Sequence, residues 1–225
     1  MPFSAWVLDN YVAPDMSKFT AASIDDMSQV DKEQAYWLAN FFLNNVAGPV
    51  QYVSPNYQQF FNFLRRSHAA FAEYAIAREA SLGYLTDPRP DRDVLRYIEA
   101  VNHWEAFLGY AWQAFSFVGR GEPVWFQPKD GSVLQRLNAL YNRSKHAEAA
   151  IERGDYIEPS PLCVWLTNAG LSSTDATLTF PEIAEILVQM AQIASAIQHP
   201  ASVQSKVKEY LAEIGENGEN DRSDA

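Results

Sequence analysis

Apolar residues recur every three to four positions along most of the chain, which is the spacing of helices that bury one face. The longest unbroken stripe lies near the C-terminus and includes Ile183, Ile186, Leu187 and Met190. The same periodicity predicts helices over about 31–46, 54–82, 91–118, 132–153 and 179–199, with a short last helix over 202–214.

Local signals mark where these helices begin and end. Ser54 and Ser132 each precede a periodic apolar stretch, and a serine there accepts the first unsatisfied backbone N–H groups of a helix. Asp31 is expected as an N-cap or first-turn residue. Gly83 and Gly154 are expected to end the second and fourth helices.

Two short segments between the fourth and fifth helices have the composition of β-strands. Residues 162–167 and 176–180 are rich in β-favouring side chains and are separated by turn-like residues 168–174, which predicts a β-hairpin. Residues 3–12 predict one further short strand in an otherwise irregular segment 1–30. Residues 215–225 are polar and are expected to be a disordered tail.

The predicted fold is therefore mainly α. It is an antiparallel bundle of five or six helices with a small β-hairpin before the penultimate helix. Because no long linker interrupts the pattern, residues 1–214 are expected to form a single helical domain.

Composition narrows the environment and the classes of partner. The net charge of −11 opposes broad attraction to nucleic acid, although it leaves room for a small basic cleft. Cys163 is the single cysteine and cannot form an intrachain disulfide. The N-terminus lacks a signal-peptide pattern, and no run of about 18 apolar residues predicts a membrane span. A cytoplasmic location without membrane contact is expected.

Most familiar site patterns do not occur. No zinc or phosphate-loop spacing is found, and we predict neither a bound metal nor a cofactor. Glu99 and His103 are four residues apart on one predicted helix, so they either hold a ligand together or form a solvated pair. Cys163 falls within a predicted strand, which favours a buried apolar role.

One segment of the fourth predicted helix concentrates polar chemistry. Asn142, Arg143, Lys145 and His146 lie within one and a half turns, and Arg136 lies two turns earlier. A histidine among cations is held neutral and can act as a general base. We therefore predict His146 as a base and Arg143 as a phosphate contact, with Asn142 orienting the imidazole.

A structural interpretation of the same residues also stands. In it the two cations are solvated, while Asn142 and His146 satisfy polar needs at a helix interface. Further binding contacts are expected from Arg136, Lys145 and Tyr141.

The segment 141–146 resembles the motif of the HEPN superfamily, whose helical-bundle proteins carry an Arg, a polar residue and then a His on a late helix. Asn142 matches the polar position and His146 the histidine, whereas Tyr141 stands where the family has its Arg. The resemblance implies a homodimer whose motifs face each other across a cleft and cleave RNA without metal. Some members are modified on a Tyr two residues after the His; here that position is Glu148.

Three functions remain open from the sequence, the third of them being a ligand-binding or metal-binding bundle that uses Glu99 and His103. The first is a diverged HEPN-like protein that binds RNA or cleaves it as a metal-independent endoribonuclease. The second is a non-catalytic interaction or scaffold protein that acts through a dimer or partner surface. The acidic balance and the aromatic loop 124–126 favour the second function.

Overall fold

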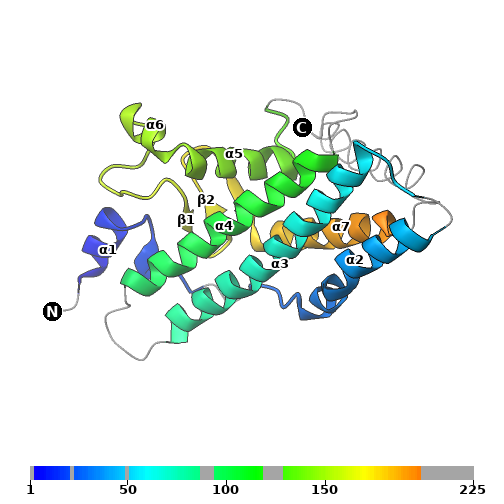
Figure 1. Ribbon diagram of the computed structural model, residues 1–225. Helices are drawn as coiled ribbons and strands as arrows, with labels where there is room; N and C mark the ends of the chain where they lie inside the picture. Colours follow the sequence, from blue (N-terminus) through cyan, green and yellow to red (C-terminus); the bar gives the residue numbers. More distant parts are fainter. Residues whose placement is uncertain (1–2, 21–22, 49–50, 87–93, 119–128, 199–225) are drawn as a thin grey trace, which may run out of the picture.

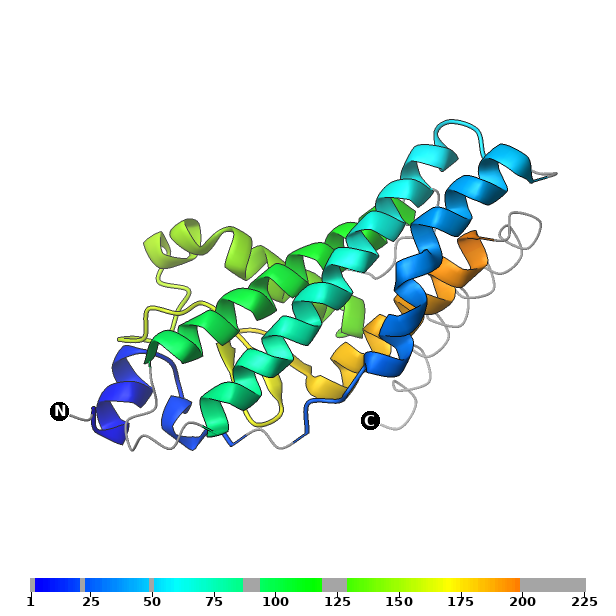
Figure 2. The same ribbon diagram turned by 60° about the horizontal axis from the view of Figure 1, so that its bottom comes forward.

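The protein is mainly helical, as the sequence predicts, and its centre is a long antiparallel pair of helices. These are α3 (Asn56–Thr86) and α4 (Val94–Val118), which lie side by side in both ribbon views (Figures 1 and 2). Helices α2 (Ser28–Ala47) and α7 (Phe180–Ile197) pack against α3, and α5 (Val133–Lys145) packs against α4. The computed structural model describes residues 3–20, 23–48, 51–86, 94–118 and 129–198.

The core forms where α3, α4 and α7 meet. Trp104 of α4 is fully buried, and its indole N–H donates a hydrogen bond to the hydroxyl of Ser81 on α3 at 3.0 Å. The rings of Tyr74 and Phe180 lie 5.4 and 5.6 Å from the Trp104 ring. Because each aromatic buries a large area, this cluster holds the three helices together. The apolar stripe predicted for the last described helix is buried as expected.

The N-terminal prediction of a strand over 3–12 is wrong. Residues Ala5–Tyr11 form helix α1, followed by a 3-10 turn over Met16–Lys18. The hydroxyl of Ser4 accepts the N–H of Val7 at 3.3 Å and caps the helix. The β-favouring side chains did not decide the outcome, because a strand needs a partner and a capped helix satisfies its own backbone.

Two helix boundaries also differ from the predicted ones. Helix α2 begins at Ser28, so Asp31 lies within the helix and not at its cap. Helix α3 continues past Gly83 to Thr86. A glycine inside a helix costs only about 1 kcal/mol, and Tyr84, which is 1% exposed, anchors the last turn in the core.

The predicted hairpin is a three-stranded antiparallel sheet, ordered β1 (Trp165–Leu166), β2 (Gly170–Ser172) and β3 (Thr177–Thr179). The segment expected to be a turn supplies the middle strand, and its Leu171 is fully buried opposite Leu178. Residue 170 must be glycine, because a Cβ there would collide with the carbonyl oxygen of Leu178. A short apolar segment between two turns was too weak a signal to identify as a strand.

Helix α7 begins where the sequence predicts. The Thr179 side chain accepts the N–H of Glu182, and the Glu182 carboxylate accepts the N–H of Thr179, which makes a reciprocal capping box. Among the described helices, none is long and apolar enough to cross a membrane. The predicted last helix over 202–214, the tail 215–225 and the loop 124–126 lie outside the described residues.

Candidate functional site

The fourth predicted helix breaks at the residue singled out as a base. Helix α5 ends at Lys145, and a separate short helix, α6, runs over Ala147–Glu152. His146 joins them with φ −115° and ψ 36°, and its N–H donates to the Asn142 carbonyl at 3.0 Å. The prediction of one helix to Arg153 is therefore wrong, and His146 stands exposed at the corner between α5 and α6.

Arg143 lies on the inner side of this corner and is engaged by two carboxylates. Its guanidinium is 3.2 Å from Asp155 and 3.0 Å from Asp175, and its side chain is 12% exposed. Burial alone would lower the pKa of Arg143, but Asp175 and Asp155 outweigh burial and raise it. Arg143 thus ties α5 to the chain after α6 and to the turn between β2 and β3.

The corner encloses a pocket of about 420 Å³. Asn142, Arg143 and His146 all line it, together with Arg153 and Asp175. The structure therefore brings together the three residues predicted as a catalytic set. The pocket offers an imidazole, an amide and two guanidinium groups, which are donors that suit phosphate oxygens.

The charges in the pocket are largely balanced. Arg153 donates a hydrogen bond to Asp155 at 2.9 Å, and Arg143 contacts the same carboxylate. The hydrogen bonds from Arg153 and then Arg143 hold the pKa of Asp155 below its ordinary value. Asn142 donates its amide to Asn138 at 2.9 Å. Among the described residues no ion pair engages His146, so an incoming anion can contact its imidazole without displacing a carboxylate.

The three residues predicted as further binding contacts do not line this pocket. The Lys145 ammonium lies 5.6 Å from the centre of the Tyr141 ring, which is the distance of a cation–π contact. The Tyr141 ring itself packs toward Gly109 of α4. Tyr141 thus faces α4, and the pocket lies elsewhere on α5.

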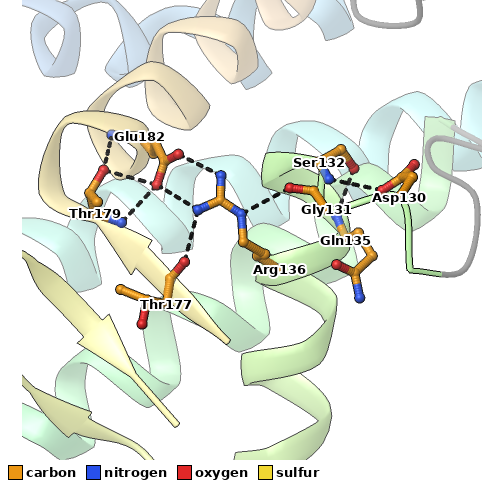
Figure 3. Close-up of polar contacts among 8 residues, drawn as sticks. All are labelled: Asp130, Gly131, Ser132, Gln135, Arg136, Thr177, Thr179 and Glu182. Carbon is orange, nitrogen blue, oxygen red and sulfur yellow. Dashed lines mark hydrogen bonds and ion pairs between the residues drawn. The ribbon is translucent and has the colours of Figure 1, made fainter. Parts of the chain in front are cut away.

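Arg136 is committed to a structural contact two turns earlier on α5, which Figure 3 shows in detail. Its guanidinium donates to both oxygens of Glu182 and to the Thr177 carbonyl at 2.9 Å. Burial alone would raise the pKa of Glu182, but bonds from Arg136 and Thr179 outweigh it and hold that pKa below its ordinary value. Arg136 therefore links α5 to β3 and to the start of α7.

Several residues of this region were missed by the sequence patterns. Glu105 of α4 lies beneath α5, where burial raises the pKa of its carboxyl against the opposing bond with Ser144. Its position as an acid within an apolar helix was a usable signal. Asp175 had none, because it is 32 residues from Arg143 in sequence. Cys163 is buried as predicted.

The proposed pairing of Glu99 with His103 does not form. Nδ1 of His103 instead lies 2.7 Å from a carboxylate oxygen of Glu73 on α3. Across the part of the chain that the structure describes, no group of three or more His, Cys, Asp or Glu side chains is placed to hold a metal ion.

A second pocket, of about 480 Å³, lies between residues 26–28 and α3. Its polar groups hold the incoming chain: Arg78 donates to the Ile24 carbonyl at 3.0 Å, and Tyr74 donates to the Asp25 carbonyl at 2.8 Å. No residue of the predicted site lines it, so the corner between α5 and α6 remains the candidate functional site.

Comparisons with models of known protein families, with curated proteins and with solved structures find no match. The resemblance to the HEPN superfamily therefore rests on Asn142, near the end of α5, and on His146, the residue that follows this helix.

Proposed function

We propose that this chain is a diverged HEPN-like protein that binds single-stranded RNA at the α5–α6 pocket without cleaving it. The observation that carries the proposal is the convergence of Asn142, Arg143 and His146 on one pocket. Arg153, at the end of α6, adds a second guanidinium. These donors suit one or two phosphate groups of a strand, which fits an otherwise acidic protein.

Two residues of the segment 141–146, Tyr141 and Arg143, favour binding over cleavage. Metal-free cleavage needs a cation to stabilise charge developing on the phosphate. Arg143 is already paired with Asp155 and Asp175, and Tyr141 cannot supply a positive charge. His146 thus contacts a phosphate in this proposal, and it does not act as a base.

Fluorescence anisotropy with a labelled single-stranded RNA tests the proposal. The double variant His146→Ala, Arg153→Ala is expected to bind about tenfold more weakly, which corresponds to about 1.4 kcal/mol. Arg65→Ala is the matched control, since it removes an exposed arginine far along α3. Equal affinity of the wild type and the double variant would overturn the proposal.

Gel analysis of the same RNA separates binding from cleavage. The wild type is expected to leave the RNA intact in the presence of a chelator. If it cuts the RNA and His146→Ala does not, the catalytic form of the hypothesis replaces the binding form.

A second candidate function, as a protein-interaction module, is favoured by a separate observation. Large apolar side chains of α2 face solvent: Tyr36 and Leu43 are each 65% exposed and Val46 is 76% exposed. Contiguous exposed apolar surface is typical of interaction sites. Substituting Leu43 with Glu is expected to abolish partner binding, and an unchanged interaction profile would count against this function.

A further inference from the structure

Helix α2 carries apolar residues on two opposite faces. Its inner face packs on the core through Trp37 and Phe41, which are 2% and 1% exposed. The Trp37 ring meets Phe71 of α3 edge-on at 5.6 Å, and the Phe41 ring stacks on Tyr57 at 5.3 Å. A helix whose second apolar face remains in water has a surface that a further partner can cover.

The outer face is a continuous stripe made of Tyr36, Ala39, Leu43 and Val46, which we call the α2 stripe; all four residues are exposed. Their spacing of three, four and three residues is that of the seam of an antiparallel or parallel coiled coil. At 100° per residue the stripe lies roughly opposite Trp37 and Phe41. The stripe is therefore separate from the core contacts.

The charge pattern indicates which kind of partner fits. No Asp, Glu, Lys or Arg occurs between Glu33 and Arg65, although the whole chain carries a net charge of −11. Interface centres are depleted of charge and enriched in aromatic residues. Membrane-surface helices instead carry Lys and Arg beside their apolar face. An uncharged patch also lets two copies of an acidic protein approach without local repulsion.

The stripe is complementary to itself when two copies run antiparallel. A two-fold axis near residue 41 places Tyr36 of one copy opposite Val46 of the other, and Ala39 opposite Leu43. Each layer then pairs a larger with a smaller side chain, which is the packing that fills an interface without voids. Every contact occurs twice, as an isologous dimer requires.

We propose that the α2 stripe is the dimer interface of this protein, with two copies of α2 packed antiparallel. This inference rests on the second candidate function and names a second copy of the chain as the partner. Aromatic side chains offer about 150–250 Å² each, and the stripe with its neighbour Phe42 brings on the order of 1,000 Å² in two copies. That area reaches the lower bound of specific interfaces.

The proposed dimer has a consequence for the α5–α6 pocket. Helix α5 lies on the α4 side of the central pair and α2 lies on the α3 side (Figures 1 and 2). Two copies joined through α2 therefore carry their His146 residues on outward sides. This arrangement is the opposite of a dimer whose motifs face each other across a cleft, and it allows two separate binding pockets.

Light scattering on the full chain at about 1–100 µM tests the interface. The wild type is expected to be a dimer, and Leu43→Glu a monomer whose far-UV circular dichroism is unchanged. Ile76→Glu, which places the same charge at a 44% exposed apolar site on α3, is the control and is expected to stay dimeric. A monomeric wild type, or a dimeric Leu43→Glu variant, overturns the proposal.

Disulfide trapping tests the antiparallel geometry in a Cys163→Ser background. Mixing a Tyr36→Cys chain with a Val46→Cys chain is expected to give a cross-linked pair under mild oxidation, whereas neither chain cross-links alone. Cross-linking of Tyr36→Cys with itself would indicate a parallel pair and overturn the geometry.

Two other outcomes would show that a different partner covers the α2 stripe, and both would overturn the proposal of a homodimer. A monomeric wild type that becomes dimeric on Val207→Glu with Leu211→Glu would show that the chain's own C-terminal segment covers the stripe. A monomeric wild type that loses a different protein partner on Leu43→Glu would keep the interaction function and reject the homodimer.

Discussion

The corner between α5 and α6 and the outer face of α2 lie on opposite sides of the α3–α4 pair, and they use their side chains in opposite ways. At the corner, Arg143 is only 12% exposed and contacts two aspartates. On α2, Tyr36 and Leu43 are each 65% exposed, although their residue types suit a core.

The type of a residue and its availability to a partner are thus separate properties. Arg143 was the obvious phosphate contact, yet its pairing with Asp175 shields its charge. Helix α2 carries apolar residues on two faces, and one helix cannot bury both faces against one core. Fewer cations of α5 are therefore available to a ligand, and more apolar surface of α2 is available to a partner, than the composition implies.

The greatest difference in stability is expected between substitutions on the two faces of α2. Phe41→Ala should destabilise the fold by about 3–5 kcal/mol, because it empties a fully packed site. Leu43→Ala should change the stability of the monomer by less than about 0.5 kcal/mol. Urea unfolding at low protein concentration measures both. Equal losses would mean that the outer stripe is also part of the monomer core.

A second contrast lies within α5. Arg136→Ala should cost about 2–3 kcal/mol, because Glu182 and the Thr177 carbonyl lose their charged partner. Lys145→Ala, which removes an exposed cation from the same helix, should cost less than about 0.5 kcal/mol. Thermal unfolding of the two variants decides between a structural and a purely surface role for Arg136, and similar melting temperatures would contradict the structural role.

Removing a carboxylate partner of Arg143 should make its guanidinium group more available to RNA. Asp175→Asn removes one of its carboxylate partners and should strengthen RNA binding on the order of threefold, a modest gain because the pair is partly exposed. Asp15→Asn makes the same change of net charge at the remote pair with Lys18 and should have no effect. Anisotropy titrations measure both, and an equal gain in the two variants would assign the effect to net charge alone.

The smallest effect concerns the carboxyl group beneath α5. Because burial raises the pKa of Glu105 above 4.5, its charged form opposes folding, and the penalty is complete above the folded pKa. Glu105→Gln should therefore be more stable than the wild type at pH 7, and the difference should vanish as the pH falls below about 4.5. Denaturant titrations at several pH values test this, with exposed Glu185→Gln as the control.

The sign is opposite for Glu182, whose pKa is lowered in the folded protein. Its contribution to stability is present above the unfolded pKa of 4.5 and is lost as the pH falls through the folded value. At pH 7 the wild type should be more stable than Glu182→Gln and less stable than Glu105→Gln. Both differences should shrink in acid. A growing disadvantage of Glu182→Gln in acid would contradict the lowered pKa of Glu182, and a growing advantage of Glu105→Gln in acid would contradict the raised pKa of Glu105.

Much of the helical framework was predictable because it depends on local periodicity and caps. The start of α7 followed from Thr179, Pro181 and Glu182, which satisfy backbone groups within one turn. Helix α1 was missed because Ser4 as a cap competes with β-favouring side chains, and the outcome depends on whether a partner strand is near. The break at His146 carries no proline or glycine signal. It accompanies contacts of Arg143 with residues from two other segments.

The candidate site was predictable only in part. Asn142, Arg143 and His146 share a pocket because helical spacing places neighbours three and four residues apart on one side. Their electrostatic state was not predictable, since Asp175 comes from a distant turn of the sheet. The stretch without charge between Glu33 and Arg65 was visible in the sequence, but its exposure on α2 was not.

Interactions within a few residues set the helical class, the main helix positions and the local cluster of polar residues on α5, so these features can be predicted from the sequence alone. The neutralised cations and the apolar face that stays in water can be identified only in the folded protein. Both outcomes depend on contacts between segments far apart in the chain, such as Arg143 with Asp175 and Trp37 with Phe71. Burial and ion pairing depend on the complete fold, so the sequence alone does not show which groups of the α5–α6 pocket and of the α2 stripe are available to a partner.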